Sequence, residues 1–580
     1  MSMARQYLVL LGFAAGLAFS ASGQSVSIRP VATTLDEVPG VPPSRDFYLF
    51  HSSGVYIDEY GRVVFSARTS ENNSSFETGI WAETSPGSLE NTLIAGVQVP
   101  GQDPGVTFSS LSLSGLSGEG VAILDGSLNG PGVSSSNNET LWIYEAGSAA
   151  QLLVREGQTQ LPGPIDVSSF SFASYSDDQS RTVIHSDLSG PGVTIDNAAA
   201  RWAIDSGGQA EILTRNSDPA PEFGVDAFYS FAHVTPTAGA DAYAIVRVYG
   251  DGIDRSQNEA VMLFPANQGP GTIVARRGDP VPGHPGMVHD DFFEFTIAES
   301  GAAFLSVFAS GSPGVSGYGL LCANPVDGLT LIAATGDPVV GGAPGDTYAF
   351  ENDTNIELYY RLVDISEDGT VVFASSTGSG SNGLWLYHAN TGIQSIAIAG
   401  DVAPTPGGSY VFTDLQTASP IINSVGQIVF HAEAVETSGA PTINGVWATT
   451  PGGGLVPVLV SGQTVNVGTP GSPILKQVTS VSLQQGSPND RDEKSPFSSV
   501  LNSSGEVVLT AEFTDGAGVF VAHISHCQAD TNGDGMLSPA DFSAWVSAFN
   551  TMSPQCDQNG DGACAPADFS AWVANYNAGC

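Results

Sequence analysis

The sequence has few basic residues. Only 17 of its 580 residues are Lys or Arg, against 59 that are Asp or Glu, and the formal net charge is −42. Its two lysines are Lys476 and Lys494. A chain this acidic repels the phosphate backbone of nucleic acids, which excludes a nucleic-acid partner. Divalent cations are the natural ligands of such a chain, although the acidic residues also fit a solubilising coat on an extracellular protein.

Long apolar runs are also scarce. One occurs near the N-terminus, where Arg5 is followed by YLVLLGFAAGLAF and then by Ala21-Ser22-Gly23. This pattern predicts a secretory signal peptide over residues 1–23, with the mature protein starting near Gln24. No later stretch reaches the roughly twenty continuous apolar residues that a membrane span requires. We therefore expect a secreted protein, extracellular or at the cell surface, without a membrane span.

Cysteine is rare and concentrated at one end. Four of the five cysteines, Cys527, Cys556, Cys564 and Cys580, fall within the last 54 residues. Small modules in oxidising compartments commonly use disulfides to compensate for a thin core. Three pairings are possible, of which we prefer Cys527 with Cys580 and Cys556 with Cys564. Cys322 lies in the apolar run GYGLLCA and is expected to be a buried, inert thiol.

Common catalytic motifs are missing as well. Neither G-x-S-x-G nor H-E-x-x-H occurs, and no Gly-rich phosphate loop follows a strand pattern. Glycine (69 residues) and proline (36 residues) are abundant instead, which is typical of many tight turns. With 41% hydrophobic residues the chain can bury a large core. The composition therefore favours a mainly β body.

Residues 24–525 contain a repeat of about 60 residues. A short β run recurs eight times, for example GRVVFSA at 61–67 and GQIVFHA at 426–432. A second strand follows each run and is centred on Trp81, Trp142, Trp202, Met262, Leu321, Trp385, Trp447 and Phe520. These centres are 59 to 64 residues apart, except for a last step of 73. Because the tryptophans share one repeat position, we expect them in the core rather than on a glycan-binding surface.

Two further strands complete each repeat. One runs into a Gly-Asp or Pro-Gly turn, as in IAATGDPVVGG at 332–342, and the other is an apolar stretch such as SYVFTDL at 409–415. Four strands per unit is the blade of a β-propeller. The last repeat lacks the turn-linked strand, whereas the N-terminal segment 31–40 supplies a spare copy. We therefore predict an eight-bladed propeller closed by its N-terminal strand, with seven blades or two stacked β-sheets as alternatives.

The C-terminal residues 526–580 carry one motif twice, DTNGDGMLSPADFSAWV at 530–546 and DQNGDGACAPADFSAWV at 557–573. Its spacing matches a twelve-residue calcium loop, with oxygen ligands at positions 1, 3, 5, 7, 9 and 12 and glycine at position 6. The first loop offers Asp530, Asn532, Asp534, the Met536 carbonyl, Ser538 and Asp541; the second offers Asp557, Asn559, Asp561, the Ala563 carbonyl and Asp568. At position 9 of the second loop, water would replace the side chain of Ala565. The sequence thus predicts two bound Ca²⁺ ions.

Each loop runs into a segment with an apolar helical face, PADFSAWVSAFN or PADFSAWVANYN, whereas the residues before each loop are poor helix formers. Paired loop-helix units with Asp at position 12 resemble the dockerin module. The closing Asn-Ala-Gly-Cys resembles a dockerin variant that ends in Gly-Cys in some secreted bacterial proteins. The resemblance covers about residues 527–580. It implies a small α-helical module that docks to a cohesin-like or other cell-surface protein once its two calcium loops are filled.

The two near-identical units also imply a pseudo-twofold axis, with apolar faces buried against each other and two equivalent docking surfaces. Positions 10 and 11, which read the partner in dockerins, are Pro539-Ala540 and Pro566-Ala567 here and depart from the family's pattern. Duplication that merely yields a stable calcium mini-domain is the alternative.

Two functions are compatible with this organisation. The propeller is either a non-catalytic binding or structural unit displayed outside the cell, or a polysaccharide-degrading enzyme. Such an enzyme would be a glycoside hydrolase or a polysaccharide lyase, which cleave glycosidic bonds by hydrolysis or by elimination. The second rests on analogy, because dockerins often carry such domains. The strongest catalytic candidates are His289, Asp290, Asp291 and Glu294 in MVHDDFFEF, which break the repeat symmetry and could form an acid-base pair or a metal site.

Other polar residues have structural interpretations. Asp279, Asp337 and Asp401, with Asp218 in register, recur from blade to blade and are expected to cap turns. The charged insertion SPNDRDEKSP at 487–496 is expected to form a loop on one face of the repeat fold.

Overall fold

The computed structural model divides into two compact units, one spanning Val26–Ile524 and one containing the C-terminal residues from Ser525. It describes residues 26–578 with gaps. The residues outside the description are 1–25, 35, 41–44, 72–74, 159–160, 162–164, 176–180, 206–208, 224–226, 237–241, 251–252, 265–270, 299–300, 311–315, 325–327, 351–362, 416–418, 440, 451–453, 469–471, 484–499, 525–528, 530, 532–536, 552–555, 557, 559–563 and 579–580.

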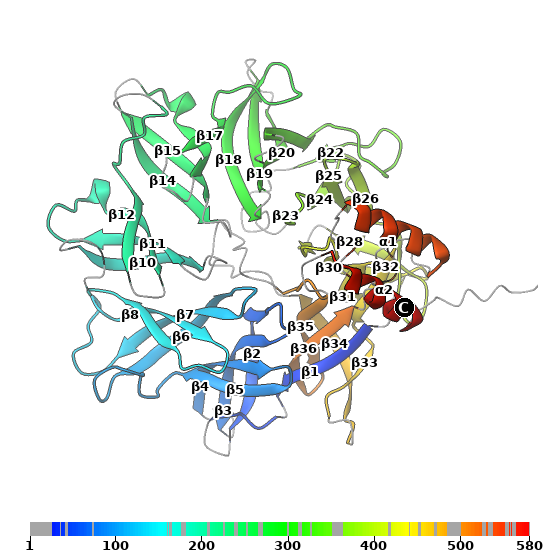
Figure 1. Ribbon diagram of the computed structural model, residues 1–580, viewed down its shortest axis with the longest axis horizontal. Coiled ribbons are helices and arrows are strands. Elements are labelled where there is room, and N and C mark those ends of the chain that lie inside the picture. Colours follow the sequence, from blue (N-terminus) through cyan, green and yellow to red (C-terminus); the bar gives the residue numbers. More distant parts are fainter. Residues whose placement is uncertain are drawn as a thin grey trace, which may run out of the picture. The chain divides into compact units, whose positions relative to one another are not determined.

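The unit Val26–Ile524 consists of eight antiparallel sheets that follow one another around a ring in chain order (Figure 1). Each sheet is a blade of a β-propeller. This architecture confirms the predicted eight-bladed fold, and the seven-bladed and stacked-sheet alternatives are wrong.

Blades 1 to 4 have four strands each. Blade 1 contains β2 (Arg45–Ile57), β3 (Val63–Glu71), β4 (Ser75–Ser85) and β5 (Ser88–Ile94). Blade 2 contains β6 (Thr107–Leu116), β7 (Val121–Asn129), β8 (Glu139–Glu145) and β9 (Gln151–Arg155). Blade 3 contains β10 (Asp166–Tyr175), β11 (Arg181–Ser189), β12 (Ala199–Asp205) and β13 (Ala210–Arg215), with the 3-10 turn η1 (Ile195–Asn197). Blade 4 contains β14 (Ala227–Pro236), β15 (Ala242–Gly250), β16 (Glu259–Phe264) and β17 (Thr272–Arg276), with η2 (Arg255–Gln257).

Blades 5 to 8 follow the same plan, with short extra strands in the last three. Blade 5 contains β18 (Met287–Ala298), β19 (Gly301–Ser310), β20 (Ser316–Asn324) and β21 (Gly328–Ala334). Blade 6 contains β22 (Tyr348–Ala349), β23 (Val363–Ile365), β24 (Val371–Thr377), β25 (Asn382–His388) and β26 (Gly392–Ile398). Blade 7 contains β27 (Val402–Ala403), β28 (Tyr410–Asp414), β29 (Ile421–Ile422), β30 (Ile428–Glu436), β31 (Thr442–Thr449) and β32 (Leu455–Val460). Blade 8 contains β33 (Thr464–Asn466), β34 (Leu475–Leu483), β35 (Glu506–Phe513), β36 (Gly516–Ile524) and β1 (Val26–Thr33).

Blade 8 joins the two ends of the propeller. β1 pairs antiparallel with β36, from Val26 opposite Ile524 to Thr33 opposite Gly518. The N-terminus therefore supplies an edge strand of the last blade, as predicted. β1 starts before the predicted segment 31–40. Most of that segment forms the turn after β1, and in this turn Asp36 accepts a hydrogen bond from the Thr33 N–H. Closure of this kind covers a strand edge that would otherwise be exposed.

The repeated tryptophans form part of the core. Trp81, Trp142, Trp202, Trp385 and Trp447 are each at most 1% exposed. Such large side chains bury more apolar area than any other residue type and hold the sheets together. The expectation that their shared repeat position marks the core is confirmed.

Aspartates cap the turns between blades, also as expected. The carboxylates of Asp218, Asp337 and Asp401 each accept a hydrogen bond, at 2.7 or 2.8 Å, from the N–H three residues earlier in the chain. In two of these turns a backbone carbonyl also accepts a hydrogen bond from a tryptophan indole. Trp385 donates to the carbonyl of Val340 at 2.8 Å, and Trp447 makes the equivalent bond in its own blade.

Buried polar side chains link neighbouring blades across the chain ends. Asn423 of blade 7 donates from Nδ2 to the Asn502 carbonyl of blade 8 at 2.9 Å. Asn502 in turn donates from Nδ2 to the Asp58 carbonyl of blade 1 at 3.1 Å. A blade made from both chain ends is thus hydrogen-bonded to the blades on its two sides.

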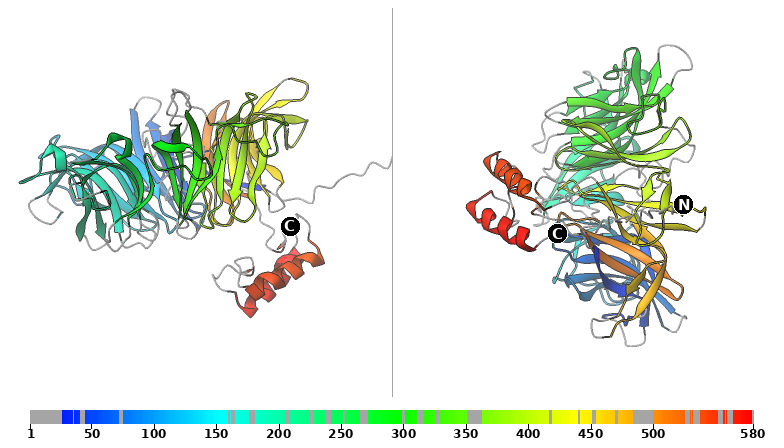
Figure 2. Two further views of the ribbon diagram at one scale, coloured as in Figure 1. Left: turned by 90° about the horizontal axis from the view of Figure 1, so that it is seen from above. Right: turned by 90° about the vertical axis from the view of Figure 1, so that its right-hand side faces the viewer.

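The C-terminal unit contains two helices, α1 (Pro539–Thr551) and α2 (Pro566–Ala578), which lie side by side (Figure 2). Each begins at a proline, whose missing N–H costs no hydrogen bond in the first turn. The core of this unit contains Ala529, Trp545 and Trp572. The two predicted exit helices are confirmed. Within the described part of the chain, no helix is both long enough and apolar enough to cross a membrane.

Candidate functional site

The two predicted calcium loops are described in part. Ser538, Asp541 and Asp568 lie within the described residues. The other predicted ligands, Asp530, Asn532, Asp534, Met536, Asp557, Asn559, Asp561 and Ala563, lie outside them.

Asp541 and Asp568 hold equivalent positions. Each is the twelfth residue of its loop, lies in the first turn of its helix, and is 0% exposed. Asp541 accepts a hydrogen bond from the Ser538 N–H, and Asp568 accepts one from the Ala565 N–H, both at 2.7 Å. The donor is the ninth residue of the loop in both cases. A helix N-terminus favours negative charge, which suits a carboxylate at each of these positions.

The second loop also returns to its own start. The Oδ1 atom of Asp568 accepts a hydrogen bond at 3.0 Å from the N–H of Gln558, the second residue of the loop. A calcium loop requires such a return, because the carboxylate at position 12 must reach the ion held by positions 1, 3 and 5. The donor set is made of carboxylate, amide and carbonyl oxygens, the hard ligands that Ca²⁺ prefers. The residues present therefore fit calcium.

Cys556 and Cys564 form a disulfide, with their Cα atoms 5.6 Å apart. This confirms the preferred pairing at the second loop, where the bond brackets loop positions 1–7. The second preferred pair, Cys527 with Cys580, lies outside the described residues. Cys322 is buried, as expected.

The two helices make reciprocal contacts. The indole of Trp545 on α1 donates to the Cys556 carbonyl at the entry to the second loop, and the indole of Trp572 on α2 donates to the Thr531 hydroxyl in the first loop, both at 3.1 Å. Each helix thus holds the opposite loop. This exchange is the arrangement expected of two units related by a pseudo-twofold axis.

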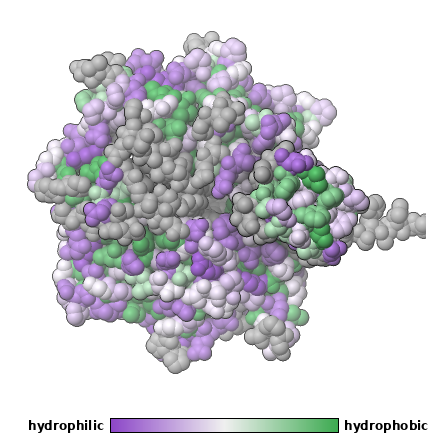
Figure 3. All heavy atoms as spheres, viewed as in Figure 1, coloured by the Kyte–Doolittle hydropathy of each residue, from purple (hydrophilic) through white to green (hydrophobic). Residues whose placement is uncertain are grey.

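The module also carries hydrophobic residues on its surface (green in Figure 3). Phe542 and Phe569, at equivalent positions of the two helices, are 39% and 45% exposed, and their ring centroids are 5.9 Å apart. Val573, which follows Phe569 by one helical turn on α2, is also exposed. Large exposed apolar side chains on so small a unit are typical of a contact surface.

In the propeller, the predicted catalytic candidates do not form one solvent-facing group. His289 is 1% exposed, and its Nδ1 lies 2.9 Å from the hydroxyl of the fully buried Ser306. Burial lowers the pKa of His289 to about 4, so its ring is neutral at neutral pH. Asp290 instead pairs with Arg277 at 2.9 Å, and the side chain of Glu294 lies outside the description. Buried groups such as His289 and Ser306 have no surface to present to a substrate.

Asp291 faces a carboxyl group that sequence reasoning missed. Glu259, on β16 of blade 4, is 2% exposed and accepts a hydrogen bond from Arg247 Nε at 3.0 Å. Its other oxygen is buried beside the carboxyl of Asp291 on β18 of blade 5. Burial first, and then Asp291, raises the pKa of Glu259 to about 7. Glu259 therefore takes up a proton near neutral pH, beside Asp291 at the boundary between two blades.

This carboxyl pair makes the stability of the propeller depend on pH. The folded chain binds the Glu259 proton more tightly than the unfolded chain, so the stabilising contribution is complete below about pH 4.5 and is lost as the pH rises to about 7. Glu259→Gln imitates the protonated carboxyl. We expect the melting temperature of the wild type to fall relative to Glu259→Gln between pH 5 and pH 8 in calorimetric scans.

Asp290→Asn, which changes an exposed carboxylate next to the pair, is the matched control and should keep the pH profile of the wild type. Parallel profiles for the wild type and Glu259→Gln would show that the pKa of Glu259 is not raised in the folded chain.

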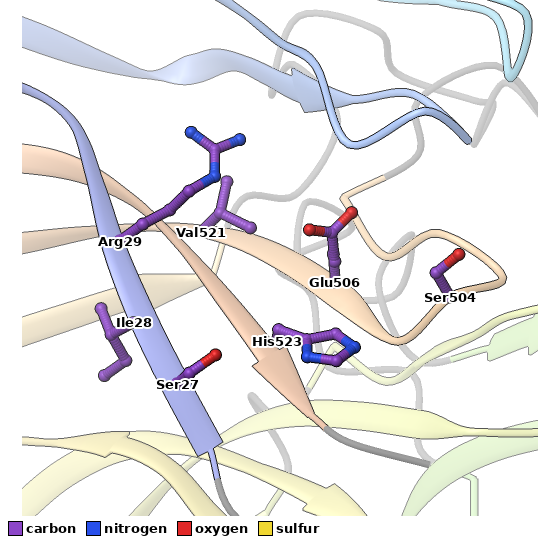
Figure 4. A pocket seen from close by; sticks show the side chains of 7 residues that line it. All are labelled: Ser27, Ile28, Arg29, Ser504, Glu506, Val521 and His523. Atoms are coloured by element: carbon purple, nitrogen blue, oxygen red, sulfur yellow. The ribbon is translucent and has the colours of Figure 1, made fainter. Parts of the chain in front are cut away.

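A cavity of about 560 Å³ lies on blade 8, where the chain ends meet. Its lining residues are Ser27, Ile28, Arg29, Ser504, Glu506, Val521 and His523 (Figure 4). They come from β1, from β35 and the turn before it, and from β36. We call this cavity the seam pocket. Sequence reasoning missed it because its walls come from opposite ends of the propeller segment.

Arg29, on one side of the seam pocket, ties β1 to blade 1. Its NH1 and NH2 groups donate to the two carboxylate oxygens of Glu83 at 2.7 and 2.9 Å. NH2 also donates to the Gly61 carbonyl at 2.7 Å. The Glu83 side chain is 0% exposed and further accepts hydrogen bonds from the N–H groups of Val63 and Gly87. This bidentate pair holds the closing strand against the neighbouring blade.

The eight sheets and the pairing of β1 with β36 define the protein as an eight-bladed β-propeller closed by its N-terminal strand, with a small helical unit at its C-terminus. Residues 24–525 match the model of DUF7453, a family of unknown function. Since the match spans most of the sequence, the chain belongs to this family. No curated protein gives a significant match.

Solved structures with similar folds are distant. The β-propeller domain of the Trilobed protease from Pyrococcus furiosus is 9% identical, with a TM-score of 0.35 over 69% of this chain and 93% of that chain. The Dos1 propeller is 10% identical, with a TM-score of 0.34 over 83% and 94%. A PL25 ulvan lyase is 8% identical, with a TM-score of 0.29 over 71% and 92%. Scores this low carry no argument about function.

Proposed function

We propose that this protein is a secreted β-propeller that is held at its place of action by a dockerin-like C-terminal module. The module binds two Ca²⁺ ions and then docks to a cohesin-like or other cell-surface protein. The propeller serves a non-catalytic binding or structural purpose. Its acidic composition, the N-terminal signal-like segment and the disulfide at the second loop support an extracellular setting.

The observation that carries the proposal is the equivalence of Asp541 and Asp568. Two fully buried carboxylates sit at the twelfth position of two matching loops, and each accepts a hydrogen bond from the ninth residue. Burying an ionised carboxylate is costly unless it is paired or bound to a metal ion. We infer that a Ca²⁺ ion in each loop is the metal that these carboxylates bind.

The exposed aromatic pair supports docking through the helices. Phe542 and Phe569 lie at equivalent positions on α1 and α2. Rotation of the module by a half-turn therefore places one ring where the other was, so a partner can bind in either of two orientations. Docking in this way depends on calcium, because the loops position both helices. The interpretation that the module is only a calcium mini-domain does not account for these exposed rings.

Calorimetric titration of the full-length protein with Ca²⁺ tests this function. We expect two bound ions in the wild type and none in the double variant Asp530→Ala, Asp557→Ala, which removes the first ligand of each loop. Asp290→Asn, which removes an exposed carboxylate from the propeller, should still bind two ions. Equal binding by the wild type and the double variant would refute the proposal.

A further inference from the structure

Two aromatic side chains lie together on the surface of blade 1. Tyr48 on β2 and Phe76 on β4 are 48% and 49% exposed, and their ring centroids are 4.8 Å apart. Tyr48 is the extra residue of a β-bulge between Phe47 and Leu49, and a bulge re-aims a side chain away from the regular pleat. Leu49 is exposed as well. We call Tyr48 and Phe76 the blade 1 pair; contiguous exposed apolar groups of this kind mark a contact surface.

The repeat itself does not require the blade 1 pair. In the other blades with this bulge, the position of Tyr48 holds a polar residue, namely Ser109, Ser168, Asp290, Thr413 or Thr479. The position of Phe76, five residues before Trp81, is not aromatic in any other blade. Counted back in the same way from the other strand centres, it holds Asn137, Asn197, Gln257, Ser316, Gly380, Thr442 and Asp515. Core packing of the blades therefore does not explain why blade 1 exposes two rings.

A second aromatic pair lies at the same end of blade 4. Phe228 on β14 is directly opposite Tyr249 on β15, with ring centroids 5.8 Å apart, and Tyr249 is exposed. The Tyr249 hydroxyl lies 2.6 Å from the hydroxyl of Ser217, which holds the ring in place. In both blades the aromatic residues lie where the first strand begins and the second ends. Because the strands follow the same order in every blade, both pairs lie on one face of the propeller.

Polar side chains flank the blade 1 pair. Asp46 is exposed and lies opposite Ser70, which in turn lies opposite Phe76. Arg68 precedes Ser70 by two residues, so it projects from the same face of β3, and it is also exposed. Within the part of the chain that the structure describes, Arg68 forms no ion pair. A hydrogen-bond acceptor and a hydrogen-bond donor therefore border the rings, and a hydroxyl group can use both.

We propose that this face of the propeller binds a neutral polysaccharide, with sugar rings stacked on the blade 1 pair and on Tyr249. This ligand rests on, and specifies, the binding role proposed above for the propeller. An aromatic face is weakly negative and attracts the C–H groups of a sugar ring, while the sugar hydroxyls accept from Arg68 and donate to Asp46. A chain of identical sugars can use both aromatic pairs. The net charge of −42 opposes an acidic polysaccharide.

Affinity electrophoresis of the full-length protein in Ca²⁺ tests the proposal. Native gels contain hydroxyethyl cellulose, xyloglucan or galactomannan, which are neutral, or polygalacturonate, which is acidic. At least one neutral polysaccharide should retard the wild type, and polygalacturonate should not. Tyr48→Ser and Phe76→Asn insert residues that blades 2 and 3 carry at the same positions, so both variants should fold. Each should weaken binding by about tenfold, as removal of a central aromatic contact does, and Tyr249→Ser should weaken it as well.

Tyr60→Ser is the matched control. Tyr60 is an exposed tyrosine in the turn between β2 and β3, at the opposite end of the same blade. Its replacement should leave the retardation unchanged. The proposal is overturned if none of the three neutral polysaccharides retards the wild type, or if the double variant Tyr48→Ser, Phe76→Asn is retarded equally. A wild type that sediments as a dimer, beside a monomeric double variant, would also overturn it, because a second copy would then cover the blade 1 pair.

The calcium titration and the gels report on different parts of the chain. A protein that binds two Ca²⁺ ions but is retarded by no neutral polysaccharide would keep its docking function and lose the ligand assigned to the propeller. Retardation without calcium binding would do the reverse.

Discussion

Replacing Arg29 with alanine is expected to lower the free energy of unfolding of the propeller by about 3–5 kcal/mol, the usual cost of breaking a buried ion pair from one side. The Arg29 side chain is 28% exposed, but its partner Glu83 is 0% exposed and would be left as an unpaired buried charge. The loss also detaches β1 from blade 1, so the seam itself weakens. Denaturant unfolding of the full-length protein measures the effect.

The double variant Arg29→Met, Glu83→Gln provides the sharper comparison. It removes both charges and keeps an acceptor for one of the N–H groups that Glu83 serves, so it should be more stable than Arg29→Ala alone. Lys476→Ala, which breaks a pair with the half-exposed Asp515, should cost less than about 1 kcal/mol. A loss in Arg29→Ala no larger than that in Lys476→Ala would show that the pair does not hold the seam.

Replacing Asp568 with alanine is expected to unfold the helical module while the propeller stays folded. Its carboxylate accepts hydrogen bonds from Ala565 and Gln558, and each bond to a charged group is worth about 1.5–3 kcal/mol. The loss of two such bonds would exceed the free energy of unfolding of a unit of about fifty residues, because small domains are only marginally stable. The same change removes the proposed position-12 calcium ligand of the second loop.

The loss of the module should appear as a drop in the helical circular-dichroism signal at 222 nm, because the described residues of the propeller form no α-helix and only two short 3-10 turns. Ser570→Ala, an exposed change in the same helix, should leave the signal unchanged. An Asp568→Ala protein with the full helical signal, in calcium and in chelator, would show that this carboxylate does not organise the second loop.

The fold was predictable because its signals are periodic and local. The large apolar residue in the third strand of each blade, such as Trp385, recurs at nearly constant spacing, so blade number followed from the sequence. The N-terminal closing strand followed from an unequal count of strand types. The repeated motif also predicted the two C-terminal helices, and Asp541 and Asp568 lie in their first turns. The role of these aspartates as calcium ligands stays a prediction.

The remaining features depend on contacts between distant segments. Glu259 meets Asp291 across two blades, and His523 meets Ser27 across the chain ends. No local sequence pattern predicts such pairs, because each residue alone occupies an ordinary surface or strand position. His289 illustrates the converse: it stands out from the repeat, yet it is buried against Ser306. A break in symmetry marks a special environment without saying whether it faces solvent.

We propose that calcium orders the C-terminal docking module and leaves the propeller unchanged, so that the two parts respond to calcium separately. Hydrogen exchange of the full-length protein, in excess Ca²⁺ and in EGTA, tests that separation most directly. Amides in residues 526–580 should become strongly protected when calcium is added, while those in residues 26–524 exchange at the same rates in both conditions. Equal exchange of residues 526–580 with and without calcium would contradict the proposal that calcium orders this module.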